Sequence, residues 1–279
     1  MICFPNAKIN LGLNIISKRE DGYHNLETLF YPVNLNDVLE IVPAQDQKNV
    51  FVQYGTPISG NPSDNLVMKA YRLLQSRYEV PEVAVYLRKN IPLGAGLGGG
   101  SSDAAFMLKI LNEFAGLGID NRRLEALASL LGADCPFFIE NRPVFAEGIG
   151  DKFTTVDLSL KAYHLLMVKP DIAISTKEAY AGVQPQKPRR SILEIIVKPI
   201  DEWKGQLVND FEQNVFVRHP EIGMIKQQLY DAGALYASMS GSGSAVFGIF
   251  ESQPAVTPLF KRLSQTLSGF HLYNPTFPM

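Results

Sequence analysis

Residues 92–105 read PLGAGLGGGSSDAA, and this glycine-rich stretch runs directly into an apolar series with helical spacing. Glycine tolerates positive φ and lets the backbone approach a ligand closely. The unpaired N–H groups and the positive dipole end of the following helix favour an anion. The stretch therefore predicts a phosphate-binding loop and an amphipathic helix, for which Ser101, Ser102 or Asp103 is available as the N-cap. The apolar series comprises Ala104, Met107, Leu108, Leu111 and Ala115.

The glycine loop has a structural alternative, because a connector between two elements can also be rich in glycine. Residues 94–100 contain five glycines, which cost conformational entropy on folding and so favour a functional loop. The P-loop pattern is excluded, since Ser101 follows Gly100 where that pattern needs Lys.

A dinucleotide-binding loop is the second hypothesis. Gly94, Gly96 and Gly99 satisfy the pattern G-x-G-x-x-G, and Asp120 is a possible acidic partner about 20 residues on. Residues 88–92 separate the preceding strand from the loop, which disfavours this hypothesis. It would make the protein an NAD(P)-dependent oxidoreductase.

The composition indicates a protein of one large or two ordinary domains. The chain has 279 residues, of which 46% are hydrophobic and 19% charged, and its net charge of -2 provides no basic field for nucleic acid. No basic leader and no apolar run of membrane-spanning length is present, so we expect a cytoplasmic protein without a membrane partner. We expect a small-molecule substrate, and a monomer or a weak homodimer.

Cysteine and histidine form no metal-binding pattern in the sequence. Cys3 and Cys135 make neither a disulfide framework nor a metal cluster, and the four histidines lack ligand spacing. Any metal should therefore arrive with a nucleotide.

Two charged residues stand in unusual surroundings. Lys8 lies between Ala7 and Ile9, and a lone lysine of this kind is more often a surface side chain than a cation in a cleft. Asp134 lies between a helix end and a proline turn, beside Phe137; a partly desolvated carboxylate and a solvent-facing turn are comparably supported.

The pattern of elements favours the α+β class, because strands and helices mix without strict alternation. A helix over 66–78 should be capped by Ser63 or Asp64, with Asn65 in its first turn, and another from Asp120 should end at Gly132. We expect a second glycine-serine loop at 238–244. Strands are expected near 3–16, 26–33, 38–42, 83–87, 163–168 and 245–250. A hairpin or bend is expected over 145–152, a short helix around 179–180, and helices from Pro220 and Pro254.

Three separated segments resemble the GHMP kinases, named for galactose, homoserine, mevalonate and phosphomevalonate. PLGAGLGGGSSDAA is similar to their central phosphate loop, SMSGSGSAVFG (238–248) to their C-terminal glycine loop, and PNAKINL (5–11) to their first motif. PNAKINLGL, DGYH (21–24) followed by LETLF, GADCPFF and FAEGIG together resemble the branch whose acceptor is a cytidine diphosphate-linked methylerythritol of non-mevalonate isoprenoid biosynthesis.

The resemblance implies a two-domain α+β GHMP kinase fold. An ATP-binding N-terminal domain over residues 1–155 would contain a left-handed βαβ crossover, and a C-terminal domain over 156–279 would be ferredoxin-like. It also implies ATP and Mg²⁺ as cofactors and phosphoryl transfer to the 2-hydroxyl of the acceptor.

The resemblance assigns Lys8 and Asp134 as the catalytic pair, which reverses the surface interpretation of Lys8. Asp134 would take the proton of the acceptor hydroxyl, and Lys8 would offset the charge on the attacking oxygen and the γ-phosphate. The choice of Mg²⁺-binding serine lies between Ser101 and Ser102, with Ser102 as the working assignment. The implied ATP contacts are Gly94, Gly96, Leu97, Gly98, Gly99, Gly100, Ser101, Ser102 and, near the adenine, Asn65.

The acceptor contacts are also implied by the resemblance. Tyr23 would stack on the cytosine, His24 would hydrogen-bond to it, and Tyr180 would supply a second aromatic face. Asn10 and Thr176 would contact the methylerythritol diphosphate half. A different GHMP acceptor, such as homoserine, mevalonate or a sugar, would leave the three ring side chains unexplained, and a non-catalytic nucleotide-binding module would bind ATP without turnover.

Overall fold

The computed structural model describes residues 1–44 and 50–278 and divides into two compact units. Unit 1 comprises Met1–Ala7, Leu35–Leu93 and Gly98–Arg142. Unit 2 comprises Lys8–Asn34, Gly94–Leu97 and the described residues from Pro143 onward. Both units are therefore built from separated pieces of the chain.

A four-stranded sheet in the order β1-β4-β6-β5 forms one layer of unit 1. β4 (Val38–Pro43) is antiparallel to β1 (Ile2–Cys3) and to β6 (Val83–Lys89), whereas β5 (Phe51–Gly55) is parallel to β6. The connection from β5 to β6 contains the 3-10 turn η2 (Pro62–Asp64) and helix α1 (Leu66–Gln75). This is the βαβ crossover of unit 1; its left-handed sense stays a prediction.

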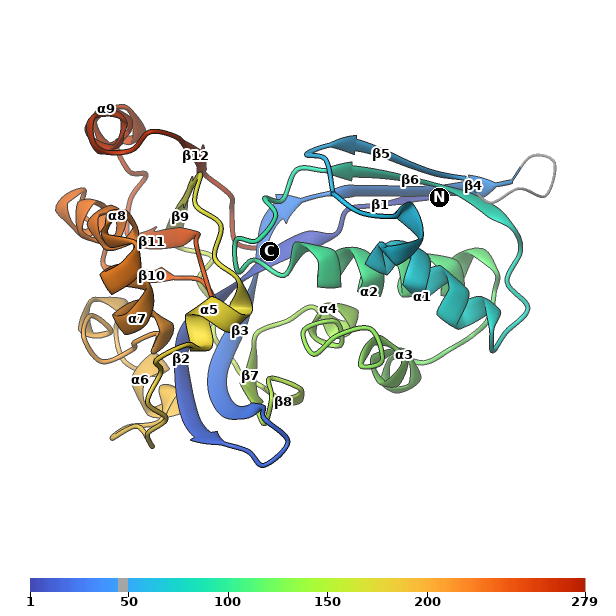
Figure 1. The fold of residues 1–279 in the computed structure, drawn as a ribbon, viewed down its shortest axis with the longest axis horizontal. Helices are drawn as coiled ribbons and strands as arrows, with labels where there is room; N and C mark the ends of the chain where they lie inside the picture. The colour runs from blue at the N-terminus through green and yellow to red at the C-terminus, as the bar shows by residue number, and fades with distance from the viewer. Residues whose placement is uncertain (45–49, 279) are drawn as a thin grey trace. The chain divides into compact units, whose positions relative to one another are not determined.

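Helices cover one face of this sheet. α1 and α2 (Gly99–Phe114) lie side by side below it, and α3 (Asn121–Ala128) and the short α4 (Phe137–Glu140) lie beyond them (Figure 1). The side chains of Ala104, Met107, Leu108 and Leu111 on α2 are buried, so the apolar series seen in the sequence is the core-facing stripe of this helix.

The predicted caps of α1 and α2 are wrong. α2 begins at Gly99, and its N-cap is Gly98, whose left-handed φ of 70° is accessible to glycine; Ser101, Ser102 and Asp103 therefore lie inside the helix. α1 begins one residue after Asn65, whose side-chain oxygen accepts the Val67 N–H at 2.9 Å. Ser63 and Asp64 belong to the preceding 3-10 turn.

The predicted ends of two helices are also wrong. α1 ends at Gln75 rather than at residue 78, and α3 ends at Ala128 rather than at Gly132. After α3 the chain continues in a tight turn, in which the Leu131 N–H donates to the Ala128 carbonyl at 2.9 Å. Turn-type bonds of this kind extend the apparent helical pattern without extending the helix.

The first sheet of unit 2 has the order β2-β3-β7-β8. β2 (Asn6–Lys18) begins at the end of a unit 1 segment, and β3 (His24–Asn36) returns after the Asp-Gly turn, where Gly22 has a φ of 85°. β3 pairs antiparallel with β7 (Val144–Glu147), which forms a hairpin with β8 (Lys152–Thr155). Of the hairpin or bend predicted over residues 145–152, the structure thus has the hairpin.

The second sheet of unit 2 is antiparallel and has the order β10-β11-β9-β12. Helices separate β9 from β10 and β11 from β12, so the chain order is the split βαββαβ pattern, and the ferredoxin-like prediction is confirmed. α8 (Pro220–Asp231) and α9 (Val256–Thr266) pack on this sheet (Figure 1). The strands are β9 (His164–Pro170), β10 (Tyr236–Met239), β11 (Val246–Phe250) and β12 (Phe270–Tyr273).

The stretch between β9 and α8 holds more structure than the sequence predicted. Of its short elements only α5 (Thr176–Tyr180) was expected; α6 (Ile192–Ile196), η3 (Ile200–Glu202) and α7 (Phe211–Arg218) were not. Elements of this length show too few periods of hydrophobic spacing to be distinguished from a loop. Trp203 follows η3, is fully buried and packs edge-on against Tyr236.

The two cysteines are free thiols, and Cys135 is buried. Burial raises the pKa of the Cys135 thiol to about 11. Within the described ranges, no helix combines the length and apolarity needed to cross a bilayer.

The C-terminal tail is anchored on β3. The Asn34 N–H donates to the Thr276 carbonyl at 2.9 Å, and the Asn34 side-chain amide donates to the Thr276 hydroxyl at 3.0 Å. Phe277 is 5% exposed and packs edge-on against Tyr31 with ring centroids 5.3 Å apart. The tail is therefore part of the core of unit 2.

We expect Phe277→Ala to lower the free energy of unfolding by about 3–5 kcal/mol, because it removes a buried ring and leaves a cavity. Urea titration followed by circular dichroism measures the change. Val217→Ala is the control, since Val217 is 83% exposed and its loss should change stability by about 0.5 kcal/mol or less. Equal midpoints for Phe277→Ala and the parent would contradict an anchoring role.

Candidate active site

The glycine loop has the backbone geometry that the sequence predicted. Gly94, Gly96 and Gly98 adopt φ values of 58°, 73° and 70°, which side-chain-bearing residues rarely adopt. The loop belongs to both units, because Gly94–Leu97 lies in unit 2 and unit 1 resumes at Gly98.

The unit 2 part of the loop packs on the second glycine-serine loop. A Cβ placed on Gly96 would lie 1.9 Å from the Ser240 carbonyl oxygen, so no larger residue fits. The Ser240 hydroxyl donates to the Gly96 carbonyl at 2.9 Å, and the Ala245 N–H donates to the Ala95 carbonyl at 3.3 Å. The second loop thus supports the first rather than acting as a separate connector.

Asn209 orders the second loop. Its buried side-chain amide donates to the carbonyl oxygens of Met239 at 2.8 Å and Gly241 at 2.9 Å. Asn209 could not be predicted as a site residue, because it lies in a stretch of sequence without a recognisable pattern.

Lys8 is held inside unit 2, so its interpretation as a surface lysine is wrong. The residue is 3% exposed, and its Nζ donates to Asn10 Oδ1 at 2.5 Å and to the Gly96 carbonyl at 3.2 Å. Nζ also lies 4.8 Å from the centre of the Phe30 ring, which is favourable for a cation. Burial of the ammonium is tolerated because these groups replace water.

Asn10 connects Lys8 to β3. Its Nδ2 donates to Thr28 Oγ1 at 2.9 Å, and the Thr28 hydroxyl donates to the Gly12 carbonyl at 2.6 Å. This relay fixes the orientation of Asn10 and therefore of the Lys8 ammonium. Thr28 was missed, although it lies in the LETLF segment that follows DGYH.

The first turn of α2 presents two serines in different surroundings. Ser101 lies near Cys135, where its hydroxyl lowers the pKa of that thiol against the larger effect of burial. Ser102 is fully buried, and its Oγ has no hydrogen-bond partner among the described residues. An unpartnered buried hydroxyl costs about 1–3 kcal/mol, so Ser102 fits a group that is brought in by a ligand better than Ser101 does.

A buried ion cluster lies next to this turn. The Lys89 ammonium donates to Asp37 and, at 2.7 Å, to Asp103 Oδ2, and the Lys89 side chain is only 1% exposed. Burial raises the pKa of Asp103 well above its usual range; Lys89 opposes this effect and Asp37 adds to it. Lys89 shares one face of β6 with Val83, Val85 and Leu87, a period-2 pattern in the sequence that could have indicated its burial.

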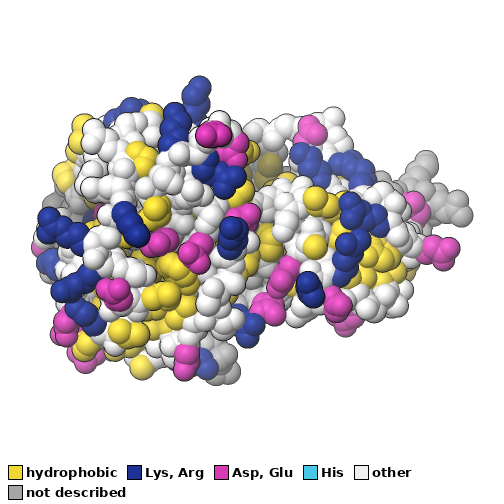
Figure 2. All heavy atoms as spheres, turned by 90° about the horizontal axis from the view of Figure 1, so that it is seen from below, with side chains coloured by type: hydrophobic (Ala, Val, Ile, Leu, Met, Phe, Trp, Pro, Cys, Tyr) yellow, Lys and Arg dark blue, Asp and Glu magenta, His cyan; other side chains and the backbone are white. Residues whose placement is uncertain are grey.

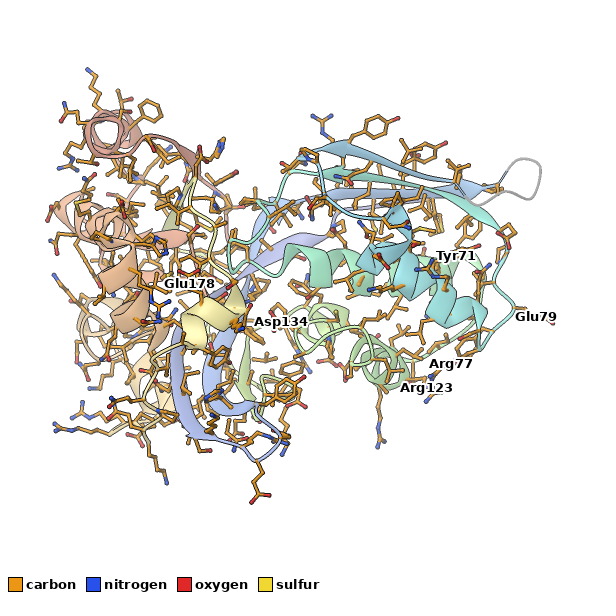
Figure 3. The ribbon with its side chains drawn as sticks, viewed as in Figure 1. Tyr71, Arg77, Glu79, Arg123, Asp134 and Glu178 are labelled. Atoms are coloured by element: carbon orange, nitrogen blue, oxygen red, sulfur yellow. The ribbon has the colours of Figure 1, made fainter. Side chains whose placement is uncertain are left out.

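Asp134 is half-buried in the turn that leads into α4 (Figure 3). Cys135, Phe137 and Phe138 next to it are buried, so the carboxylate is partly shielded from water, which is one of the two alternatives that the sequence leaves open. Reciprocal amide hydrogen bonds of 2.6 and 3.2 Å between Asn6 and Asn141 fix the far end of this segment.

The structure brings His24 and Tyr180 together, whereas Tyr23 stands apart. The rings of His24 and Tyr180 are stacked with centroids 4.7 Å apart, and Tyr180 packs edge-on against Phe211. Tyr23 is 63% exposed, and its N–H donates to Asp21 Oδ1. Burial, assisted by Lys18, lowers the pKa of His24, so the neutral ring offers one donor and one acceptor at pH 7.

Helix α5 carries Thr176, which is exposed at its first position, and Tyr180 at its last. Glu178 of α5 pairs with His219 at 2.9 Å (Figure 3), and the Asn214 side-chain amide donates to the Glu178 carbonyl at 3.1 Å. These contacts attach α5 to α7, and neither was anticipated from the sequence.

The residues that the structure describes contain no group of three or more histidine, cysteine, aspartate or glutamate side chains placed to hold a metal ion. On the face shown in Figure 2, basic and acidic side chains are interspersed.

The chain matches the two domains that define one protein family. The GHMP kinases N terminal domain matches residues 65–142, and the GHMP kinases C terminal domain matches residues 197–269. Among solved structures, a mevalonate kinase from Methanococcus jannaschii covers 100% of this chain and is itself covered to 98%, with a TM-score of 0.72 and 15% identity, which shows the fold alone.

Proteins with higher sequence identity to this chain share one name. A 4-diphosphocytidyl-2-C-methyl-D-erythritol kinase of Parabacteroides distasonis is 60% identical over 90% of this chain and 92% of its own length. One from Bacteroides thetaiotaomicron is 58% identical over 91% and 93%. A crystal structure of 4-(cytidine 5'-diphospho)-2C-methyl-D-erythritol kinase has a TM-score of 0.81 and 32% identity, with complete coverage of both chains.

These similarities contradict the dinucleotide-binding hypothesis, because the glycine pattern at Gly94, Gly96 and Gly99 lies in a kinase fold. The chain belongs to the GHMP kinases and, within them, to the 4-diphosphocytidyl-2-C-methyl-D-erythritol kinase family.

Proposed function

We propose that the protein transfers the γ-phosphoryl group of ATP to the 2-hydroxyl of 4-diphosphocytidyl-2-C-methyl-D-erythritol, a step of isoprenoid precursor biosynthesis. The observation that carries the proposal is the buried ammonium of Lys8, which is hydrogen-bonded to the Gly96 carbonyl of the glycine loop. A fixed cation beside a phosphate loop is suited to phosphoryl transfer, where catalysis is mainly positioning and charge stabilisation. The choice of acceptor is supported by the relatives of 57–60% identity.

Asp134 is proposed as the general base and Lys8 as the stabilising cation. Asp134 takes the proton from the acceptor hydroxyl, and Lys8 offsets negative charge on the attacking oxygen and the γ-phosphate. The hydrogen bonds through Asn10 and Thr28 fix the position of the Lys8 ammonium. Little movement of this side chain is therefore needed as negative charge develops on the reacting groups.

Gly94–Ser102 is proposed to bind the phosphates of ATP, with help from the N-terminus of α2. The orphaned Ser102 Oγ is the proposed contact to Mg²⁺, which when bound neutralises phosphate charge. Asn65 is proposed to lie near the adenine; its oxygen caps α1, which leaves its amide nitrogen for this contact.

The acceptor is proposed to be held by its cytosine and by its diphosphate half. His24 hydrogen-bonds to the base, and Tyr180 and Tyr23 supply aromatic faces. Asn10 and Thr176 are assigned to the methylerythritol diphosphate half. We also propose domain limits of 1–155 and 156–279, a cytoplasmic location, and a monomer or weak homodimer.

Acceptor specificity tests the proposal directly. ADP release is measured in a coupled assay with Mg-ATP and one of four acceptors: the cytidine-linked substrate, the same acceptor without its cytidine phosphate, homoserine or mevalonate. We expect turnover with the cytidine-linked acceptor alone, because only it offers a base to His24 and Tyr180. Turnover with homoserine or mevalonate instead would overturn the acceptor assignment while leaving the kinase class.

We expect Asp134→Asn to lower kcat by at least about 100-fold, because an amide cannot accept the hydroxyl proton. Steady-state kinetics measure kcat, and circular dichroism verifies folding. Asp157→Asn, the same change at an exposed carboxylate, is the matched control and should leave kcat unchanged. Near-normal turnover of a folded Asp134→Asn protein would remove Asp134 from the role of base.

We expect His24→Ala to raise KM for the cytidine-linked acceptor about 10-fold or more, because the cytosine of the bound acceptor loses a hydrogen-bond partner. KM for ATP should change little. His271→Ala serves as the control, because the His271 side chain is 64% exposed. Equal increases in both KM values would be inconsistent with the proposed role of His24.

A further inference from the structure

The cluster of Asp37, Lys89 and Asp103 connects both ends of the glycine loop. At the start of the loop, Asp37 Oδ1 accepts the N–H groups of Asn90 at 2.6 Å and Ile91 at 2.8 Å. At its end, Asp103 on α2 accepts from Lys89, which also donates to Asp37. The segment from residue 92 to residue 102 is therefore closed at its base by one continuous set of hydrogen bonds.

The cluster also touches the first turn of α2. A Cβ placed on Gly99 would lie 2.9 Å from Ile91 Cγ2 and 3.3 Å from Lys89 Nζ. The backbone at Gly99 thus rests directly on the residues that the cluster holds. A shift of Lys89 or Ile91 would be transmitted to the N–H groups at the start of the helix.

Stability alone does not account for this arrangement. All three side chains are 3% exposed or less, and burying ions costs several kcal/mol each. Well-packed apolar residues of similar volume are often as stabilising as a buried ion pair, and the best-attested benefit of buried polar groups is the selection of one register or geometry.

Asp37 and Asp103 differ in how many hydrogen bonds their carboxylates accept. The two oxygens of Asp37 accept three hydrogen bonds, from Lys89, Asn90 and Ile91. Asp103 accepts one through Oδ2, and its Oδ1 has no hydrogen-bond partner in the described part of the chain. Asp103 therefore contributes one acceptor to Lys89, and an amide oxygen can supply the same acceptor.

We propose that Asp37, Lys89 and Asp103 form a positioning clamp, which fixes the two ends of the glycine loop relative to each other and thereby sets its affinity for the phosphates of the nucleotide. The proposal rests on the proposed function in taking ATP as the ligand of the loop. None of the three side chains contacts the nucleotide; they act through the backbone of residues 90–91 and of the first turn of α2. Loss of the clamp should weaken nucleotide binding and leave acceptor binding unaffected.

Asp103 is the residue to change, because its removal leaves the neutral pair of Lys89 and Asp37 and so should permit folding. We expect Asp103→Leu to weaken the binding of Mg-ADP about 10-fold or more, the equivalent of losing one hydrogen bond to a charged group. KM for ATP should rise in parallel, while KM for the acceptor should stay within about 2-fold. Asp103→Asn should bind Mg-ADP within about 3-fold of the parent, because its amide oxygen accepts from Lys89.

Isothermal titration calorimetry with Mg-ADP measures these affinities at a temperature where every variant is folded. Leu74→Ala, at a buried site in the last turn of α1, is the control for general destabilisation; it should lower the melting temperature without changing the affinity for Mg-ADP. If Asp103→Leu does not fold, Asp103→Ala replaces it with the same expected loss.

Each outcome separates the clamp from the proposed function. Equal affinity of the parent and Asp103→Leu for Mg-ADP would overturn the clamp and leave the kinase proposal standing. Loss of affinity in Asp103→Asn as large as in Asp103→Leu would also overturn it, since the rescue would have failed. Absence of Mg-ADP binding by the parent would overturn the proposed function, and the clamp with it.

Discussion

The carbonyl oxygen of Gly96 is the atom on which the arrangement of Lys8 and the two glycine loops in unit 2 depends. It accepts hydrogen bonds from the Lys8 ammonium and the Ser240 hydroxyl, so one backbone atom joins β2, the glycine loop and the second glycine-serine loop. The contact requires glycine, because a side chain at position 96 would overlap the Ser240 backbone. The positive φ of Gly96, its close approach to the Ser240 backbone and the position of the Lys8 ammonium are therefore linked.

The two buried lysines next to the glycine loop stand in different surroundings. The Lys8 ammonium donates to Asn10 Oδ1 and to the Gly96 carbonyl. Lys89 is surrounded by two carboxylates and has its charge neutralised. The Lys8 contacts place a buried ammonium beside the glycine loop, whereas the Lys89 cluster suits a structural connection.

The family, the α+β class and most long elements could be predicted from the sequence, because glycine patterns and hydrophobic spacing are local signals. The positive φ values at Gly94 and Gly96 and the apolar stripe of α2 followed from residue type alone. The burial of Lys8 did not, since it depends on Thr28 and Ser240, which lie far away in the sequence. The caps at Gly98 and Asn65 were misjudged because several polar or small residues in a row each satisfy the same local rule.

The division into units also bears on how the protein is synthesised. The chain passes from one unit to the other after residues 7, 34, 93, 97 and 142, so neither unit corresponds to one continuous segment. β2 and β3 leave the ribosome early, yet the core they share with β9–β12 is complete only after residue 273 has been added. Unit 1, whose last residue is Arg142, has its full sequence when half of the chain has been made. Nascent chains therefore carry the β2–β3 hairpin without its partner strand β7 until residue 147 has been added, a period in which exposed strand edges favour aggregation and chaperone binding.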